Sequence, residues 1–214
     1  MEAYGVAGYE MPRSLLLNYS YELPFGRGRQ FLGHGDGFGY RVLDEVIGGW
    51  NIAGVTTWNP KGTPLLVPDV GGGLTAPGAA LRYSLAPGAK VVQSTNYSGA
   101  LVDPNLGTFF NSSPVTVLNP SAFVKTPDFT LSNAPFIFPN VRNPGSFFTD
   151  ATLLKRFPLS AEGSRYFEIR LEAQNIFNHA NYNNIDNNLN DATFGGVMGK
   201  SGQRIMQIGA RIFF

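Results

Sequence analysis

Apolar and polar side chains alternate with a period of two in five segments of this chain of 214 residues. Successive side chains of a β-strand point to opposite faces, so each segment predicts a strand with two different sides. The clearest segment is residues 166–177, where apolar residues share one side and charged residues the other: Phe167, Ile169 and Leu171 against Glu168, Arg170 and Glu172. The five predicted strands cover residues 13–23, 49–59, 147–157, 166–177 and 204–214.

The length of these segments separates two kinds of β-protein. Strands of globular proteins usually have about 5–6 residues, whereas a strand that crosses a membrane at its usual tilt needs about 9–11. Each segment here is roughly 11 residues long, which favours the wall of a barrel. A transmembrane helix needs about 18 consecutive apolar residues, and no stretch of this chain has that many. The predicted fold is therefore all-β, an antiparallel transmembrane β-barrel.

Six aromatic residues form three pairs that share a strand face at separations of eight or ten residues: Trp50 with Trp58, Phe147 with Phe157, and Phe167 with Phe177. At ~3.3 Å per residue, each pair spans roughly 26–33 Å along its strand. With a tilt of about 40°, that becomes a depth of ~20–25 Å, close to the apolar band of about 25 Å between the aromatic girdles of outer-membrane barrels. The six residues are therefore predicted girdle residues.

Charged residues on the other side of these strands are candidates for the interior of the predicted barrel. Glu168, Arg170 and Glu172 alternate in sign along one strand, and Asp150 lies on the polar side of another. In a soluble protein such a row is the wet side of a sheet, whereas in a barrel it points into the lumen, where water solvates it. The barrel prediction makes all four lumen-lining residues.

Composition and motifs narrow the classes of function. Charged residues make up only 14% of the chain and the net charge is +1, which argues against an electrostatic nucleic-acid binder. The absence of cysteine excludes disulfides and thiolate metal sites. The sequence shows no paired-carboxylate site, nucleophile triad or phosphate loop. We therefore expect no enzymatic activity, no cofactor and no bound metal.

The linkers between the predicted strands differ in length, and they cover residues 24–48, 60–146, 158–165 and 178–203. Outer-membrane barrels combine short periplasmic turns with longer extracellular loops. With the C-terminus in the periplasm, residues 60–146 form a long extracellular loop and residues 158–165 a periplasmic turn. Residues 24–48 are long for such a turn.

The end of the chain resembles the assembly signal of outer-membrane proteins. That signal has a polar residue, a glycine two positions on, and alternating apolar residues up to a terminal aromatic. Four residues fit it: Gln207, Gly209, Ile212 and Phe214. The resemblance implies that the barrel-assembly machinery reads this last strand.

Longer stretches, in the family's order, resemble the C-terminal barrel of TonB-dependent receptors of the Oar-like, carboxypeptidase-regulatory-domain type. They span nearly the whole chain: YELPFGRG at 21–28, GGWNIAG at 48–54, NPSAF at 119–123, RNPG at 142–145 and RLEAQNIFNH at 170–179. The resemblance implies an energy-coupled receptor in the bacterial outer membrane, with residues 1–214 as the C-terminal part of its barrel.

The same resemblance implies partners. They are outer-membrane lipid, a periplasmic energy-coupling protein that acts through a plug domain, and an unidentified solute such as an oligosaccharide, a peptide or a chelate. The chain shows no signal peptide, TonB box or plug, so we expect those parts upstream. Five strands also fall short of the about eight of the smallest barrels, so the barrel is expected to be incomplete. Two alternatives stay open: a secreted soluble β-sandwich that binds or adheres, and a small autonomous eight-stranded barrel.

Overall fold

The computed structural model describes residues 7–32, 35, 37–69, 82–160 and 162–214. The chain divides into two compact units, which we call the sheet unit and the loop unit. The sheet unit comprises Leu15–Trp58, Phe147–His179 and Gly202–Phe214. The loop unit comprises Met1–Ser14, Asn59–Ser146 and Ala180–Ser201.

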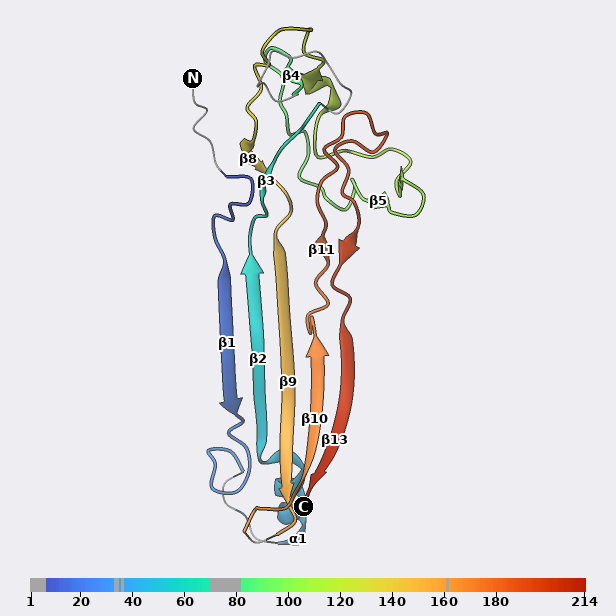
Figure 1. Cartoon of the computed structure of the whole chain (residues 1–214). Coiled ribbons are helices and arrows are strands. Elements are labelled where there is room, and N and C mark those ends of the chain that lie inside the picture. Colours follow the sequence, from blue (N-terminus) through green and yellow to red (C-terminus); the bar gives the residue numbers. More distant parts are fainter. Residues whose placement is uncertain (1–6, 33–34, 36, 70–81, 161) are drawn as a thin grey trace. The chain divides into compact units, whose positions relative to one another are not determined.

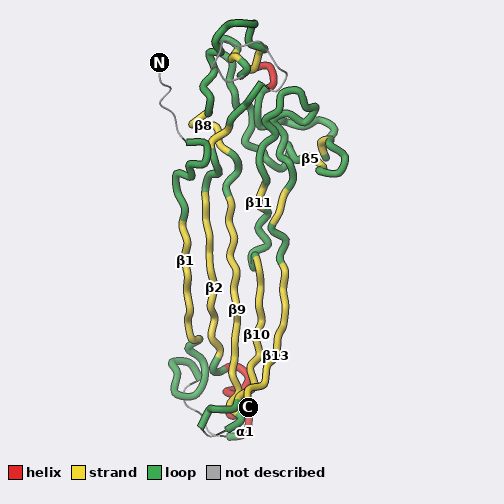
Figure 2. Tube along the Cα trace, in the orientation of Figure 1, coloured by secondary structure: helices red, strands yellow, loops and turns green. Residues whose placement is uncertain are grey.

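Five long strands form the sheet unit in the spatial order β1-β2-β9-β10-β13, each antiparallel to its neighbours (Figures 1 and 2). Their bounds are Leu15–Glu22 (β1), Trp50–Asn59 (β2), Ser146–Pro158 (β9), Tyr166–Gln174 (β10) and Ile205–Phe213 (β13). All five predicted strands are confirmed. The fourth, however, ends at Gln174 and not at residue 177, because Asn175 has a φ of 46°, a left-handed conformation that interrupts an extended strand.

The pairing register sorts the side chains onto two faces. Residues paired directly across two strands lie on the same side, and Ile169 of β10 pairs with Ala210 of β13 and Lys155 of β9. The Oγ1 atoms of Thr56 and Thr149 lie 3.1 Å apart, which joins the matching sides of β2 and β9. The apolar face carries Leu15, Leu17, Tyr19, Trp50, Ile52, Leu153, Phe167, Ile169, Leu171, Ile208 and Ile212. The polar face carries Asn18, Ser20, Asp150, Thr152, Arg156, Glu168, Arg170, Glu172, Gln207 and Arg211.

Both outer strands of this sheet lack a second neighbour among the described residues. β1 and β13 are its two edges, so these strands form an open sheet and not a closed barrel. Every residue of β13 is exposed. In a bilayer the backbone groups of an edge strand must be paired, which only closure provides. The expected incomplete barrel is therefore what the structure shows.

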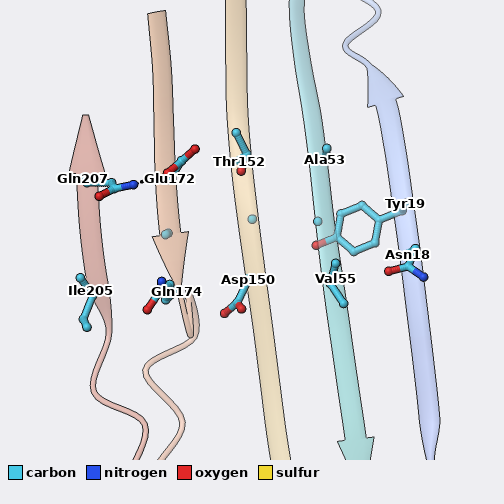
Figure 3. Close-up of a pocket in the computed structure, with 13 residues that line it drawn as sticks. Asn18, Tyr19, Ala53, Val55, Asp150, Thr152, Glu172, Gln174, Ile205 and Gln207 are labelled. Carbon is cyan, nitrogen blue, oxygen red and sulfur yellow. Dashed lines mark hydrogen bonds between the residues drawn. The ribbon is translucent and has the colours of Figure 1, made fainter. Parts of the chain in front are cut away.

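A glycine in β2 lets three strands approach one another. Gly54 pairs with Tyr19 of β1, whose ring lies across β2 in Figure 3. A Cβ atom at position 54 would lie 2.6 Å from the carbonyl oxygen of Asp150 in β9 and would also collide with the Tyr19 hydroxyl. Any side chain at Gly54 would therefore push the ring away from the sheet.

The linker between β1 and β2 contains a helix that the sequence pattern did not predict. This helix, α1, runs from Phe38 to Ile47. It accounts for the length of residues 24–48, which is unusual for a turn between neighbouring strands. No helix in the described part of the chain has the length and apolar character needed to cross a bilayer.

The loop unit has short strands and a 3-10 helix, η1. Their bounds are Pro64–Leu65 (β3), Ser84–Leu85 (β4), Val102–Asp103 (β5), Thr108–Phe109 (β6), Pro120–Ala122 (η1), Phe123–Val124 (β7), Phe138–Arg142 (β8), Asn181–Tyr182 (β11) and Lys200–Ser201 (β12). Residues 70–81 of the predicted loop at 60–146 lie outside the described residues.

A hydrophobic core holds the loop unit together. Leu118 and Val197 are completely buried. The ring of Phe123 packs edge-to-face against Phe138 and Phe194, with centroid distances of 6.0 and 5.5 Å. These residues come from both long linkers, 60–146 and 178–203, so the two linkers fold on each other.

Candidate functional site: the polar face of the sheet

A row of ion pairs and hydrogen bonds crosses three strands on the polar face. Arg156 Nε donates to Glu168 Oε2 at 2.9 Å. The Arg170 guanidinium contacts Glu168 Oε1 at 3.3 Å and Glu172 Oε1 at 3.2 Å. Gln207 of β13 donates its amide to the other oxygen of Glu172. Three of the four predicted lumen-lining residues are thus brought together in one network.

Glu168 is the most enclosed member of this row. Only 3% of its side chain is exposed, and each of its oxygens has an arginine partner. A carboxylate so far removed from water is costly unless it is paired. The two arginines remain 58% and 34% exposed and Glu172 30%, so the row presents charges of both signs to its open side.

The fourth predicted lumen residue, Asp150, lies apart from the row. Its Oδ1 accepts the backbone N–H of Asn175 at 2.8 Å. The same part of the polar face has a shallow hollow of about 410 Å³ (Figure 3). Its polar lining includes carboxylate, amide and hydroxyl groups, from Asn18, Asp150, Thr152, Glu172, Gln174 and Gln207. Groups of these kinds can hydrogen-bond a polar solute.

The six predicted girdle residues fall into two groups at opposite ends of the sheet unit. Phe157 and Phe167 lie at one end with ring centroids 5.9 Å apart, and β2 begins there with Trp50. At the other end Phe147 stacks on Phe177 at 6.2 Å. Trp58 is the second-last residue of β2 at that same end. Phe177 lies in the turn after β10 and not within the strand. The location of these rings in the two membrane interfaces stays a prediction.

The residues of the predicted assembly signal lie on or just after the edge strand β13: Gln207, Gly209, Ile212 and Phe214. The first belongs to the polar face. The glycine pairs with Arg170, and the isoleucine pairs with Phe167 on the apolar face. The terminal phenylalanine is fully exposed. Recognition by the assembly machinery stays a prediction.

The turn after β10 contains an asparagine whose role the alternation of polar and apolar residues did not predict. Asn175 is 3% exposed. Its side-chain oxygen accepts the His179 N–H at 3.1 Å, and its amide donates to the carbonyl oxygens of His179, at 2.9 Å, and of Gly202. With the bond from its backbone to Asp150, this residue ties together the end of β10, the start of β9 and the approach to β13.

Backbone geometry explains why asparagine stands there. Asn175 and Asn178 both have positive φ angles, 46° and 51°. Asparagine tolerates this left-handed region better than most residues. Both belong to the stretch at 170–179 that resembles the receptor family, and the repeated asparagine at i and i+3 is the signal from which this turn could have been predicted.

A lysine on the apolar face was also missed. Lys155 shares the side of Leu153 and Phe157 but is only 4% exposed. Its Nζ donates to the carbonyl oxygen of Glu45 in α1 and lies 4.8 Å from the centroid of the Phe157 ring. The sequence contained a signal for it, because the alternation along the strand places this lysine on the same side as the apolar residues.

Long antiparallel strands with one apolar and one polar face make up the wall of a membrane β-barrel. A model of the outer membrane beta barrel domain family matches residues 1–207, and the chain belongs to this family. It is accordingly a protein of the bacterial outer membrane, in contact with the lipid of that membrane. No curated protein and no solved structure matches the chain.

Proposed function

We propose that the chain is part of the barrel of a TonB-dependent receptor of the Oar-like type, which takes up a scarce solute across the outer membrane without changing it chemically. The observation that carries the proposal is the turn around Asn175. The stretch at 170–179, which resembles these receptors most extensively, is the segment whose asparagine ties three strands together. The resemblance therefore falls on residues with a structural task in the barrel wall.

The orientation follows from the two ends of the sheet. At one end the strands are joined by the linker with α1 and by the short turn at residues 158–165. At the other end they lead into the loop unit, whose core makes it far larger than a turn. Because outer-membrane barrels have their long segments outside the cell, the loop unit is extracellular and α1 is periplasmic.

The polar face supports a water-filled interior. Small barrels fill their interior with packed side chains, whereas wide barrels leave space for water or a plug. The arginines of the ion-paired row are partly exposed on this face. In a wide barrel the row lines the lumen, where it can contact a plug or a polar solute such as an oligosaccharide, a peptide or a chelate.

The alternatives fare less well. Membership of an outer-membrane barrel family sets aside a secreted β-sandwich. Among the described residues, five strands reach eight residues or more, and the rest have five or fewer. These residues therefore do not build an autonomous eight-stranded barrel. In the proposed receptor, further strands pair with the edges β1 and β13, the assembly machinery reads β13, and an energy-coupling protein acts on the plug.

Uptake by intact host cells tests the proposal. Cells with and without the gene receive fluorescent oligosaccharides, labelled peptides or a ferric chelate, each with and without a protonophore that abolishes the energy supply. We expect gene-dependent uptake of one of these classes that stops with the protonophore. Gene-dependent uptake that the protonophore leaves unchanged would indicate a passive pore. An upstream reading frame without a plug domain would contradict the receptor.

A further inference from the structure

The helix α1 turns its apolar side away from the protein. Its apolar residues cover about half of the helical circumference, given 3.6 residues per turn: Phe38, Val42, Leu43, Val46 and Ile47. All of them are exposed, from 37% at Ile47 to 85% at Phe38. The half-buried residues are instead Tyr40 and Asp44, on the polar side. A helix that packs on a protein in water shows the reverse arrangement.

The polar side and the C-terminal end hold α1 on the sheet unit. Asp44 Oδ1 accepts the backbone N–H of Arg27 at 2.6 Å, in the loop after β1. Two side chains from the strands donate to carbonyl oxygens of the last helical turn. They are Trp50, which donates to Val46 at 2.9 Å, and Lys155, which donates to Glu45. Cations and N–H donors at this end also complement the helix dipole.

Both of these side chains belong to the apolar face. Because this face meets lipid in the outer membrane, α1 is fixed where the lipid-facing surface of the sheet ends. A charged Lys155 on a lipid-facing strand is costly near the membrane midplane and much less so near the interface. Its position three residues before the end of β9, with its ammonium under the helix, agrees with an interfacial depth.

We infer that α1 is an interfacial helix. Its apolar side inserts into the nearer of the two leaflets of the outer membrane, at the boundary between headgroups and acyl chains. Helices with a large apolar side and a charged opposite side lie in this boundary, with the apolar side about 5–10 Å deep. The occupant is phospholipid and not protein, because the exposed apolar side of α1 continues a surface that already meets lipid. The inference rests on the proposed orientation only for naming that leaflet as the periplasmic one.

Spin labels on single cysteines test the inference. Residues 1–214 contain no cysteine, and any cysteine elsewhere in the full-length protein is first replaced by serine. The full-length protein, reconstituted into vesicles of phosphatidylethanolamine and phosphatidylglycerol, carries a nitroxide at Val46→Cys or Leu43→Cys on the apolar side. The matched controls are Arg41→Cys and Glu45→Cys, on the other side of the same helix. Collisions with oxygen report lipid, collisions with a water-soluble nickel complex report water, and low values for both report protein.

We expect the labels at 43 and 46 to collide more with oxygen than with nickel, and the controls to show the opposite. Nickel access at all four positions would overturn the inference, as would low access to both reagents at 43 and 46, which would mean that protein covers the helix. Two positions on each side keep the test decisive if one variant does not fold. A fifth label, at Ile208→Cys on the sheet, separates the two proposals. If it is lipid-exposed while positions 43 and 46 are not, only the assignment of α1 fails.

Discussion

Replacing Asn175 by alanine should destabilise the barrel strongly although the residue lies in a turn. The change removes three side-chain hydrogen bonds, two to His179 and one to Gly202, at a position that is only 3% exposed. At about 0.5–1.5 kcal/mol each, these bonds contribute about 1.5–4.5 kcal/mol. The left-handed backbone at φ 46° adds about 1–2 kcal/mol for alanine. The expected loss is therefore about 2.5–6.5 kcal/mol of the free energy of unfolding.

Asn175→Gly separates the two contributions. Glycine loses the same hydrogen bonds but has no penalty at positive φ, so it should be about 1–2 kcal/mol more stable than the alanine variant. The full-length protein is unfolded from phospholipid vesicles with guanidinium, and tryptophan fluorescence gives the free energies. Gln174→Ala, at the exposed neighbouring position, should stay close to the parent. A loss below about 1 kcal/mol for Asn175→Ala, or equal losses for alanine and glycine, would refute this account of the turn.

Further expectations concern the two faces and the loop unit. Leu171→Arg places a charge on the apolar face and should cost about 2–4 kcal/mol near the midplane, whereas Glu172→Arg on the polar face should cost much less in the same unfolding assay. Trp58→Tyr should leave stability nearly unchanged, because either ring suits the interface; a loss as large as that of Leu171→Arg would contradict the girdle assignment. Burial and the Asp69 carboxylate raise the pKa of Tyr83 above its ordinary value of 10.0. The protonated hydroxyl therefore stabilises the fold at neutral pH and stops doing so as the pH rises through that raised pKa. Melting temperatures followed by circular dichroism should fall less steeply above pH 10.0 in Tyr83→Phe than in the parent, and parallel curves would count against this cause.

The sheet was largely predictable because its strands have two different environments. In residues 166–177, for example, successive side chains fall on an apolar and a polar face of the sheet, and this alternation can be read without coordinates. The end of β10 was not predictable in this way. Phe177 has the spacing of the apolar residues of β10, but it lies beyond the end of the strand. The chain turns at Asn175 because of the backbone conformation of that residue, which the alternation of side chains does not reveal.

The polar network and α1 show what alternation leaves out. The charges of Glu168, Arg170 and Glu172 could be assigned to one face, but the pairing with Arg156 depends on the register between β9 and β10. The helix has its apolar residues at helical spacing, a pattern that an alternation with a period of two does not detect, and glycines lie on both sides of it. The position of Lys155 among apolar residues is likewise explained only by the structure, in which Lys155 donates to a carbonyl oxygen of α1.

The longest part of the loop unit, Asn59–Ser146, has a consequence for the order of folding. This insertion separates β2 from β9, which pair although roughly 90 residues lie between them, and closing a flexible chain of that length costs ~4 kcal/mol in conformational entropy. The two ends of this insertion are tied together by Asn59 to Ser146 at 3.1 Å and by the Asn143 side chain to Thr63 Oγ1 at 3.1 Å. If residues 59–146 collapse first, these ties bring the ends of the insertion together in advance, and β2 meets β9 as if a short hairpin joined them. Asn143→Ala should then slow insertion into vesicles more than it accelerates unfolding, and the opposite outcome would mean that the strands pair before residues 59–146 fold.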